Sequence, residues 1–323
     1  MFKEAKIMFL YTETSLHCGS GSSLGVVDLP IQRERYTDYP IAQASGVKGA
    51  IREWFETRDR KNQNKDREKI KYIFGPELER DEKLEFAGAV TFTDARLLLF
   101  PVRSLRGVFA YCTSCFALER LKRDLTIAGK SVQWNVPAEP GSDKVLGIQA
   151  GNDISDGSGV LLEDFAFHFT QDTAVTKIAA WLAQNAFPQE NEYKFWRDKV
   201  MKSLLVLPEN AFRDFVKLAT EVQARIRINN ESKTVAKGAL FYEETLPSDS
   251  LLYSIVMAND PATDWGSRPE GLKSAADVIK LVTELSDKRT QFGGDSSIGR
   301  GIVYVNFLIK EDSDATNAGA KTS

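Results

Sequence analysis

Few residues in this chain are of the kinds that form disulfides or bind zinc, because its 323 residues include only three cysteines and two histidines. Cys18, Cys112 and Cys115 are too few to cross-link an extracellular domain of this size, so a reducing compartment is expected, with the cytoplasm as the default. The single C-x-x-C of Cys112 and Cys115 lacks a second pair at zinc-finger spacing, which favours buried thiols. No G-x-S-x-G or H-E-x-x-H motif supports a serine hydrolase or a zinc peptidase.

Long hydrophobic runs and an excess of one charge are also absent. No stretch approaches the roughly 18 apolar residues that cross a bilayer, and the N-terminus lacks the apolar core of a signal peptide, so no membrane partner is expected. Lys and Arg number 42 against 45 Asp and Glu, which gives a net charge of −3. A nearly neutral chain does not attract nucleic acid by bulk charge, so any such site must be a local patch.

The patterning that is present predicts a mixed α+β fold. At roughly 150 residues per domain, the length allows two domains or one enlarged by insertions. Alternating and helically spaced apolar residues indicate both kinds of element. Strands are predicted at 6–14, 84–100, 159–170, 251–258 and after 301, helices at 45–55, 108–125, 174–186, 209–218 and 275–285, and a β-hairpin at 221–241.

Two glycine-rich segments are candidate anion-binding loops. One follows the first strand at 16–23, and the other, 291–301, is predicted to join the last helix to the closing strand. Backbone N–H groups in such loops can approach a phosphate closely, and an arginine there supplies a charged fork. Tight turns that need positive φ explain the glycines equally well. The candidate phosphate contacts are Gly19, Gly21, Gly293, Gly294, Gly299, Arg300 and Gly301.

Three polar residues could take part in chemistry. His17 could contact a phosphate or act on a ribose hydroxyl, although a structural histidine is an equal interpretation. Asp28 follows a flexible loop, and its carboxylate could hold Mg²⁺, orient a ribose hydroxyl or cap a turn. Glu243, beside Glu244, is the acidic residue that could complement it. These residues leave metal-assisted catalysis and a structural role open.

Basic residues are concentrated in a few places. Lys48 and Arg52 share one face of a predicted helix, and residues 58–71 include seven basic against three acidic side chains. The predicted hairpin carries Arg225, Arg227, Lys233 and Lys237. Each set alone is an ordinary solvated face. Together with two glycine-rich loops, they suit a protein that holds an extended ribose-phosphate strand through its backbone, without reading its bases.

Five sequence runs resemble a known family. They are YTETSLHCGSG at 11–21, VVDLPIQRE at 26–34, SGVKGAIR at 45–52, LFYEETLP at 240–247, and FGGD with GRG between 292 and 301. These runs are similar to those of the repeat-associated mysterious proteins, the RAMP superfamily. Within it they resemble the repeated backbone subunits of type III-B CRISPR effectors, the Cmr complexes. The run around Asp28 points most specifically to these subunits.

The resemblance implies a fold and a set of partners. It implies one RAMP-type domain over 1–310, with a modified RRM-like, ferredoxin-like core. Insertions fall at about 58–83 and 126–250, the hairpin near 221–241 serves as a thumb, and composition predicts a disordered tail at 311–323. Several copies would stack along a guide (CRISPR) RNA, together with other Cmr subunits and a complementary target RNA.

The resemblance also implies an activity. The residue matching Asp28 is associated with cleavage of bound target RNA by its ribose 2′-hydroxyl, dependent on Mg²⁺ or another divalent cation. Asp28 is then the expected catalytic residue and metal ligand, with His17 and Glu243 positioning groups or stabilising charge. Two alternatives are a structural RNA-binding subunit without catalysis, and a metal-independent guide-processing ribonuclease that uses His17 as general base.

Overall fold

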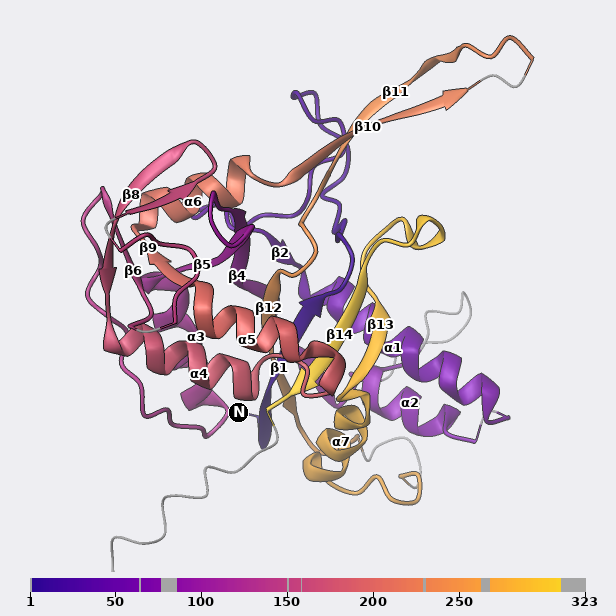
Figure 1. Ribbon diagram of the computed structural model, residues 1–323. Helices are drawn as coiled ribbons and strands as arrows, with labels where there is room; N and C mark the ends of the chain where they lie inside the picture. Colours follow the sequence, from indigo (N-terminus) through magenta and orange to yellow (C-terminus); the bar gives the residue numbers. More distant parts are fainter. Residues whose placement is uncertain are drawn as a thin grey trace, which may run out of the picture.

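The computed structural model describes residues 2–63, 65–76, 86–149, 151–157, 159–228, 231–262 and 268–308. The predicted disordered tail at 311–323 lies outside these residues. Helices and strands are mixed along the chain, as the sequence predicted (Figure 1). Within the described residues, no helix combines the length and apolar character needed to cross a membrane.

Most strands belong to one mixed sheet, built around β1 (Glu4–Thr12). Antiparallel partners flank β1 on both edges, so that Phe9 lies opposite Tyr253 on one side and Asn306 on the other. The order is β13-β14-β1-β12-β4-β5-β9-β6-β8-β7, with β2 paired to β4 and β3 to β12. The remaining strands are β2 (Ile41–Ala42), β3 (Val90–Phe92), β4 (Ala95–Arg103), β5 (Phe109–Ser114), β6 (Lys144–Gly147), β7 (Gly159–Leu162), β8 (Phe165–Gln171), β9 (Leu204–Leu207), β12 (Leu251–Ala258), β13 (Lys288–Gln291) and β14 (Ile302–Phe307).

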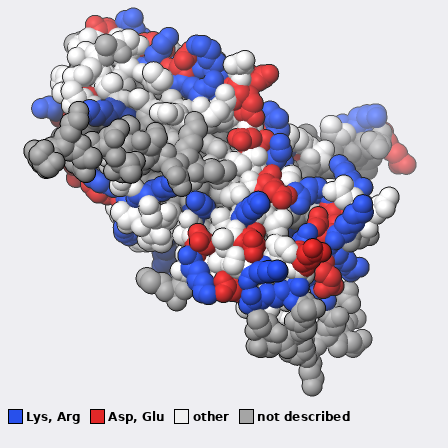
Figure 2. Space-filling view, turned by 90° about the horizontal axis from the view of Figure 1, so that it is seen from below, with Lys and Arg blue, Asp and Glu red and all other residues white. Residues whose placement is uncertain are grey.

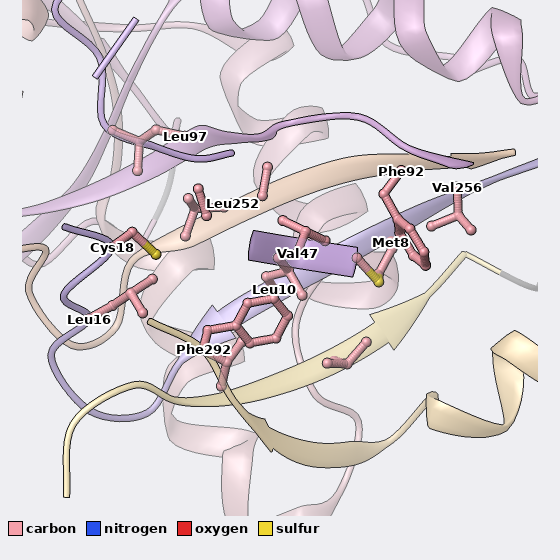
Figure 3. Packing of buried hydrophobic residues seen from close by; sticks show 14 of the residues in the cluster. Met8, Leu10, Leu16, Cys18, Val47, Phe92, Leu97, Leu252, Val256 and Phe292 are labelled. Atoms are coloured by element: carbon pink, nitrogen blue, oxygen red, sulfur yellow. The ribbon is translucent and has the colours of Figure 1, made fainter. Parts of the chain in front are cut away.

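The core lies on both faces of this sheet, because successive side chains of a strand point to opposite faces. Met8 and Leu10 of β1 belong to one buried cluster, shown in Figure 3, and Phe9 and Tyr11 belong to the other. Helices α1 (Ala44–Lys61), α2 (Arg67–Phe74), α6 (Glu209–Leu218) and α7 (Ala275–Val282) contribute to the first cluster, and α3 (Cys115–Ile127), α4 (Thr173–Asn185) and α5 (Lys194–Ser203) to the second. Short 3₁₀ turns are η1 (Asn191–Tyr193), η2 (Thr283–Leu285) and η3 (Ser296–Ile298).

Several predicted elements differ from the structure. The strand predicted at 84–100 is two strands, β3 and β4, and its first two residues lie outside the described residues. The helix predicted at 108–125 begins only at Cys115, because Ser114 caps it by accepting the N–H of Ala117, and the preceding residues form β5. The strand predicted at 159–170 is two strands, β7 and β8, with a turn at Glu163, which has a positive φ of 47°. The loop at 291–301 follows a strand, β13, and therefore joins two strands of the sheet.

The predicted hairpin is confirmed. β10 (Glu221–Ile228) pairs antiparallel with β11 (Val235–Thr245), so the hairpin extends four residues past its predicted end at 241. The pair forms a separate two-stranded sheet that projects from the body of the molecule (Figure 1). Its outer part exposes apolar side chains, among them Ile226, Ile228, Val235 and Leu240.

Candidate functional site

The base of β11 brings together segments that are far apart in the sequence. On one edge β11 pairs with β10. On the other edge Leu29 forms a parallel bridge, in which its N–H donates to the Tyr242 carbonyl at 3.0 Å and its carbonyl accepts the Glu244 N–H at 3.0 Å. Further along the same edge, Leu16 and Leu246 exchange two backbone hydrogen bonds. The surroundings of His17 and Asp28 are thereby attached to one strand.

Asp28 is fixed at this edge by a backbone donor. The N–H of Tyr242 donates to Oδ2 of Asp28 at 2.7 Å, and the Asp28 carbonyl accepts the N–H of Ser23 at 2.8 Å. Asp28 is partly exposed, and within the described residues its Oδ1 has no hydrogen-bond partner. The carboxylate is therefore held in place through one oxygen and presents the other.

His17 is anchored two residues further along β11. Its Nδ1 lies 2.7 Å from the carbonyl oxygen of Glu244. Because a carbonyl can only accept, Nδ1 must carry the hydrogen, and in the neutral ring Nε2 is the acceptor. Gly19 covers the ring closely, since a Cβ built on it would lie 2.7 Å from Nε2. His17 is thus buried with a fixed ring orientation and tautomer.

Glu243 lies in an ionic cluster between the hairpin and the loop at 292–301. Nε and Nη2 of Arg225 donate to its Oε2 at 3.0 Å and 2.7 Å, and Arg225 also donates to Asp295 at 3.2 Å. Arg300 approaches the same carboxylate at 3.8 Å and donates to Gln223 at 2.7 Å. Two arginines therefore compensate the charge of Glu243. This carboxylate is ion-paired, unlike one that is free to act as a general acid or base.

Glu244 points to the opposite face of the hairpin, as the two-residue period requires. Its carboxylate accepts the N–H of Ile31 at 3.0 Å and the hydroxyl of Thr220 at 2.7 Å, and it pairs with Arg33. The hairpin base is consequently held on both faces, by Glu243 toward the loop at 292–301 and by Glu244 toward the segment that follows Asp28.

We call residues 19–25 the first glycine loop and residues 292–301 the second glycine loop. In the second, the N–H groups of Gly294 and Gly301 donate to the carbonyls of His17 and Ser15, each at 2.9 Å, and that of Gly299 to Ser296 at 3.1 Å. These donors already have partners within the chain. Arg300 is buried, although its Nη1 has no partner among the described residues.

Lys48 and Arg52 lie on a different part of the molecule. Lys48 donates to the carbonyl of Val90 at 3.3 Å, and Arg52 donates to the carbonyl of Gly75 at 3.1 Å and pairs with Glu56. Val90 is in β3, which pairs with the end of β12 that is remote from the hairpin. Burial, and secondarily the charge of Arg52, lower the pKa of Lys48. Figure 2 shows positive and negative side chains interspersed on the face it presents.

Among the described residues, the carboxylates of the candidate site suit a divalent cation that is bound partly by the protein and partly by substrate phosphate. Within the described residues, no three His, Cys, Asp or Glu side chains lie close enough together to hold a metal. Mg²⁺ is commonly bound through one or two carboxylates together with substrate phosphates, rather than in an all-protein cage. The partly exposed Asp28 fits that arrangement, whereas the ion-paired Glu243 does not fit as a second ligand.

A family model described as the RAMP superfamily matches residues 9–304. The chain therefore belongs to the RAMP superfamily. Within it, the chain is 37% identical over 317 residues to the "CRISPR system Cmr endoribonuclease Cmr4" of Pyrococcus furiosus, covering 98% of this chain and 99% of that protein. It is 28% identical to the "CRISPR system CMR subunit Cmr4" of Saccharolobus solfataricus, covering 94% and 96%. The predicted resemblance to type III-B backbone subunits is confirmed.

Solved structures agree with these relatives. The crystal structure of oligomeric Cmr4 from Pyrococcus furiosus superposes with a TM-score of 0.68 at 31% identity, covering 94% of this chain and 98% of that chain. A chain of a type III-B Cmr-beta complex bound to cognate target RNA superposes with a TM-score of 0.70 at 23% identity, covering 95% and 98%. The second likeness shows the fold alone.

Sequence reasoning missed the residues that connect these parts. Arg225 was considered only as a phosphate contact, and Asp295 and Arg33 were not singled out. Arg33 and Glu244 are 211 positions apart, so no local pattern could have paired them. The available signal was that Arg33, Glu244 and Asp295 lie inside the runs that carry the family resemblance.

Proposed function

We propose that this chain is a repeated backbone subunit of a type III-B CRISPR ribonucleoprotein, which binds guide RNA along its backbone and cleaves complementary target RNA at regular intervals. The partners are guide RNA, target RNA, further copies of the chain and other Cmr subunits, in the cytoplasm. Membership of the family and the name of the Pyrococcus relative support an endoribonuclease. The observation that carries the catalytic assignment is the anchored, partly exposed carboxylate of Asp28.

The proposed reaction is an internal transesterification of the target strand. The ribose 2′-oxygen bonds to the adjacent phosphorus while the bond from phosphorus to the 5′-oxygen breaks, leaving a 2′,3′-cyclic phosphate and a 5′-hydroxyl that takes up a proton. Asp28 accepts or orients the 2′-hydroxyl proton through Oδ1, while Tyr242 holds Oδ2. His17 takes a positioning role through the bond from Nδ1 to Glu244 of β11, and Glu243 acts through the arginines that it binds.

A divalent cation would add electrostatic stabilisation of the phosphate when bound beside Asp28. The proposal assigns one protein ligand, Asp28, to Mg²⁺ or a similar ion. EDTA is expected to abolish cleavage by the assembled complex, and added Mg²⁺ is expected to restore it. Cleavage that continues at the same rate in EDTA would remove the cation from the mechanism. Cleavage of a repeat precursor by the isolated subunit in EDTA would favour guide processing through His17 instead.

Asp28→Asn tests the catalytic assignment more sharply than Asp28→Ala. Asparagine keeps an oxygen that can accept the Tyr242 N–H, so the anchor survives, but it can neither accept the proton nor carry the charge. We expect single-turnover target cleavage to fall at least roughly 100-fold, with unchanged assembly and target affinity. Normal cleavage by both Asp28→Asn and Asp28→Ala would instead favour a structural RNA-binding subunit. A loss confined to Asp28→Ala would show that only the anchoring hydrogen bond matters.

The guide-binding residues are a separate part of the proposal. We assign contact with the guide backbone to the two glycine loops, through Gly19, Gly21, Gly293, Gly294, Gly299, Arg300 and Gly301, and to Lys48 and Arg52. The modified RRM-like core and the use of the hairpin as a thumb belong to the same proposal. If Lys48 meets a phosphate, Lys48→Gln should weaken guide binding and reduce its salt slope by about one ion. An unchanged slope would remove Lys48 from the interface.

A further inference from the structure

The ionic cluster at the hairpin base depends on one side chain. Arg225 is in β10, and its guanidinium contacts Glu243 in β11 at 2.7 Å and Asp295 in the second glycine loop at 3.2 Å. We infer that Arg225 is a positioning residue, which holds the hairpin base against the second glycine loop and thereby sets the Asp28 carboxylate. This inference rests on the proposed function of Asp28.

The geometry of the hairpin places Arg225 for this role. Gln223 lies opposite Glu243 in the β10–β11 register, and Arg225 follows two residues later, so all three side chains lie on one face. That face meets Asp295 and Arg300 of the second glycine loop. The guanidinium of Arg225 contacts two carboxylates at once, one in the hairpin (Glu243) and one in the second glycine loop (Asp295).

The ion pair between Arg225 and Glu243 is more buried than an ordinary surface ion pair, so its loss should have a larger effect. The Glu243 side chain is only 4% exposed, and the cluster contains two arginines and two carboxylates. Without Arg225, the guanidinium of Arg300 would remain near Glu243, but only at 3.8 Å, and Asp295 would lose its contact with Arg225. Because a buried carboxylate is costly unless it is paired, Glu243 would then move toward solvent.

Displacement of Glu243 would reach Asp28 through the backbone. The preceding residue, Tyr242, donates the N–H that holds Oδ2 of Asp28. The following residue, Glu244, donates to Leu29 and accepts the hydrogen bond from His17. A shift of Glu243 therefore disturbs the anchors of both site residues together. The contacts that the structure gives Arg225 are with Glu243 and Asp295, so its effect is indirect.

The first test measures order rather than activity. In the guide-loaded complex without target, Arg225→Met is expected to increase amide hydrogen exchange in residues 241–245 about tenfold. Arg227→Met is the matched control, because Arg227 is the next arginine of β10 and is exposed. Unchanged exchange in Arg225→Met, or equal acceleration in Arg227→Met, would overturn the inference.

The second test separates positioning from RNA contact. At saturating target, Arg225→Met should lower the single-turnover cleavage rate on the order of 100-fold, since small misplacements of reacting groups have effects of that size. Target affinity should stay within about threefold, because the inference places no phosphate on Arg225. A loss of affinity with an unchanged rate would mean that Arg225 binds RNA, and would overturn the inference.

The third test is rescue. Glu243→Gln removes the buried charge that Arg225 compensates, so the double variant Arg225→Met with Glu243→Gln should cleave at least about tenfold faster than Arg225→Met alone. If the double variant shows no recovery, charge compensation is not the role of Arg225. Asp28→Asn in the same assay keeps the two proposals apart. Normal cleavage there ends the catalytic assignment, while the exchange result still decides whether Arg225 positions the hairpin.

Discussion

The first glycine loop is bonded mainly to the segment next to it, whereas the second glycine loop is bonded to distant parts of the chain. In the first, Ser20 donates to Pro30 and Ser23 donates to Asp28. In the second, Gly294 and Gly301 donate to the segment around His17. The first loop is therefore held by its neighbouring segment, whereas the second loop also ties distant segments of the chain together, in addition to the guide contact proposed for both loops.

The glycines of the two loops differ in the space around them. A Cβ on Gly293 would lie 2.2 Å from the carbonyl oxygen of His17, and one on Gly301 would lie 2.0 Å from that of Phe292. A Cβ on Gly21 would meet no atom within 4 Å. Leu24 in the first glycine loop and Val26 just after it are almost fully exposed. Alanine variants of single glycines therefore test how tightly each loop is packed.

The largest effect is expected from Gly293→Ala. Its φ of +69° is unfavourable for alanine, and the added methyl group would collide with backbone that cannot move independently. We expect the free energy of unfolding in urea to fall by roughly 3 kcal/mol. Gly299→Ala is the control, because its φ of +81° is also positive but no atom lies within 4 Å. Equal losses in both variants would show that close packing is not the reason for Gly293.

A smaller effect is expected from Gly19→Ala, which lies where the first loop meets His17. The methyl group would lie 2.7 Å from Nε2, so the ring must turn and lose its hydrogen bond to Glu244. The expected loss of stability is about 1 to 2 kcal/mol. The loss should largely disappear in a His17→Ala background, as a double-mutant cycle measures. A full loss in that background would place the effect in the backbone.

Gly21→Ala should cost still less. The φ of Gly21 is +99°, so alanine is strained there, but there is space for its methyl group. Thermal unfolding should report a loss of about 1 kcal/mol. Gly25→Ala, where no positive φ occurs, should be close to neutral. If Gly21→Ala destabilised as much as Gly293→Ala, the first glycine loop would be packed rather than open.

The smallest effect is a pH dependence of thiol alkylation at Cys18. Burial raises the pKa of this thiol to about 12. Because the pKa is raised, the fraction of reactive thiolate continues to increase at pH values above 9. Alkylation should therefore keep accelerating beyond pH 9 instead of levelling off. In Gly293→Ala, labelling at pH 8 should be faster, because the loop no longer covers this segment. A plateau near pH 9 in the unaltered protein would contradict the burial of Cys18.

Much of the fold could be predicted from local patterns. The alternation at 6–14 predicted a strand covered on both faces, and β1 contributes to both cores. The hairpin was predicted from alternation around a polar turn. The helix predicted from Val108 began too early because the apolar run fits either period, and only the pairing of β5 with β4 and β9 decides between them.

The sequence singled out candidate site residues but not the contacts that hold them. His17, Asp28 and Glu243 were singled out, and the structure attaches all three to β11. The partners of His17 and Asp28 could not be inferred, because these two contacts join residues 227 and 214 positions apart and depend on how the hairpin leaves the sheet. For Lys48 and Arg52, the helical spacing correctly predicts that the two cations are neighbours. It does not predict the carbonyl groups to which they donate.

The place of β1 has a consequence for how the chain acquires its structure during synthesis. Its two neighbours in the sheet are residues 251–258 and 302–307, so the central strand is made long before either partner. At roughly 5 to 20 residues per second, a ribosome would need on the order of 10 to 50 s to reach them. During that interval the apolar side chains of β1 lack their strand partners, so the sheet can form only after residues 302–307 have left the ribosome, and the nascent chain should depend on chaperones until then.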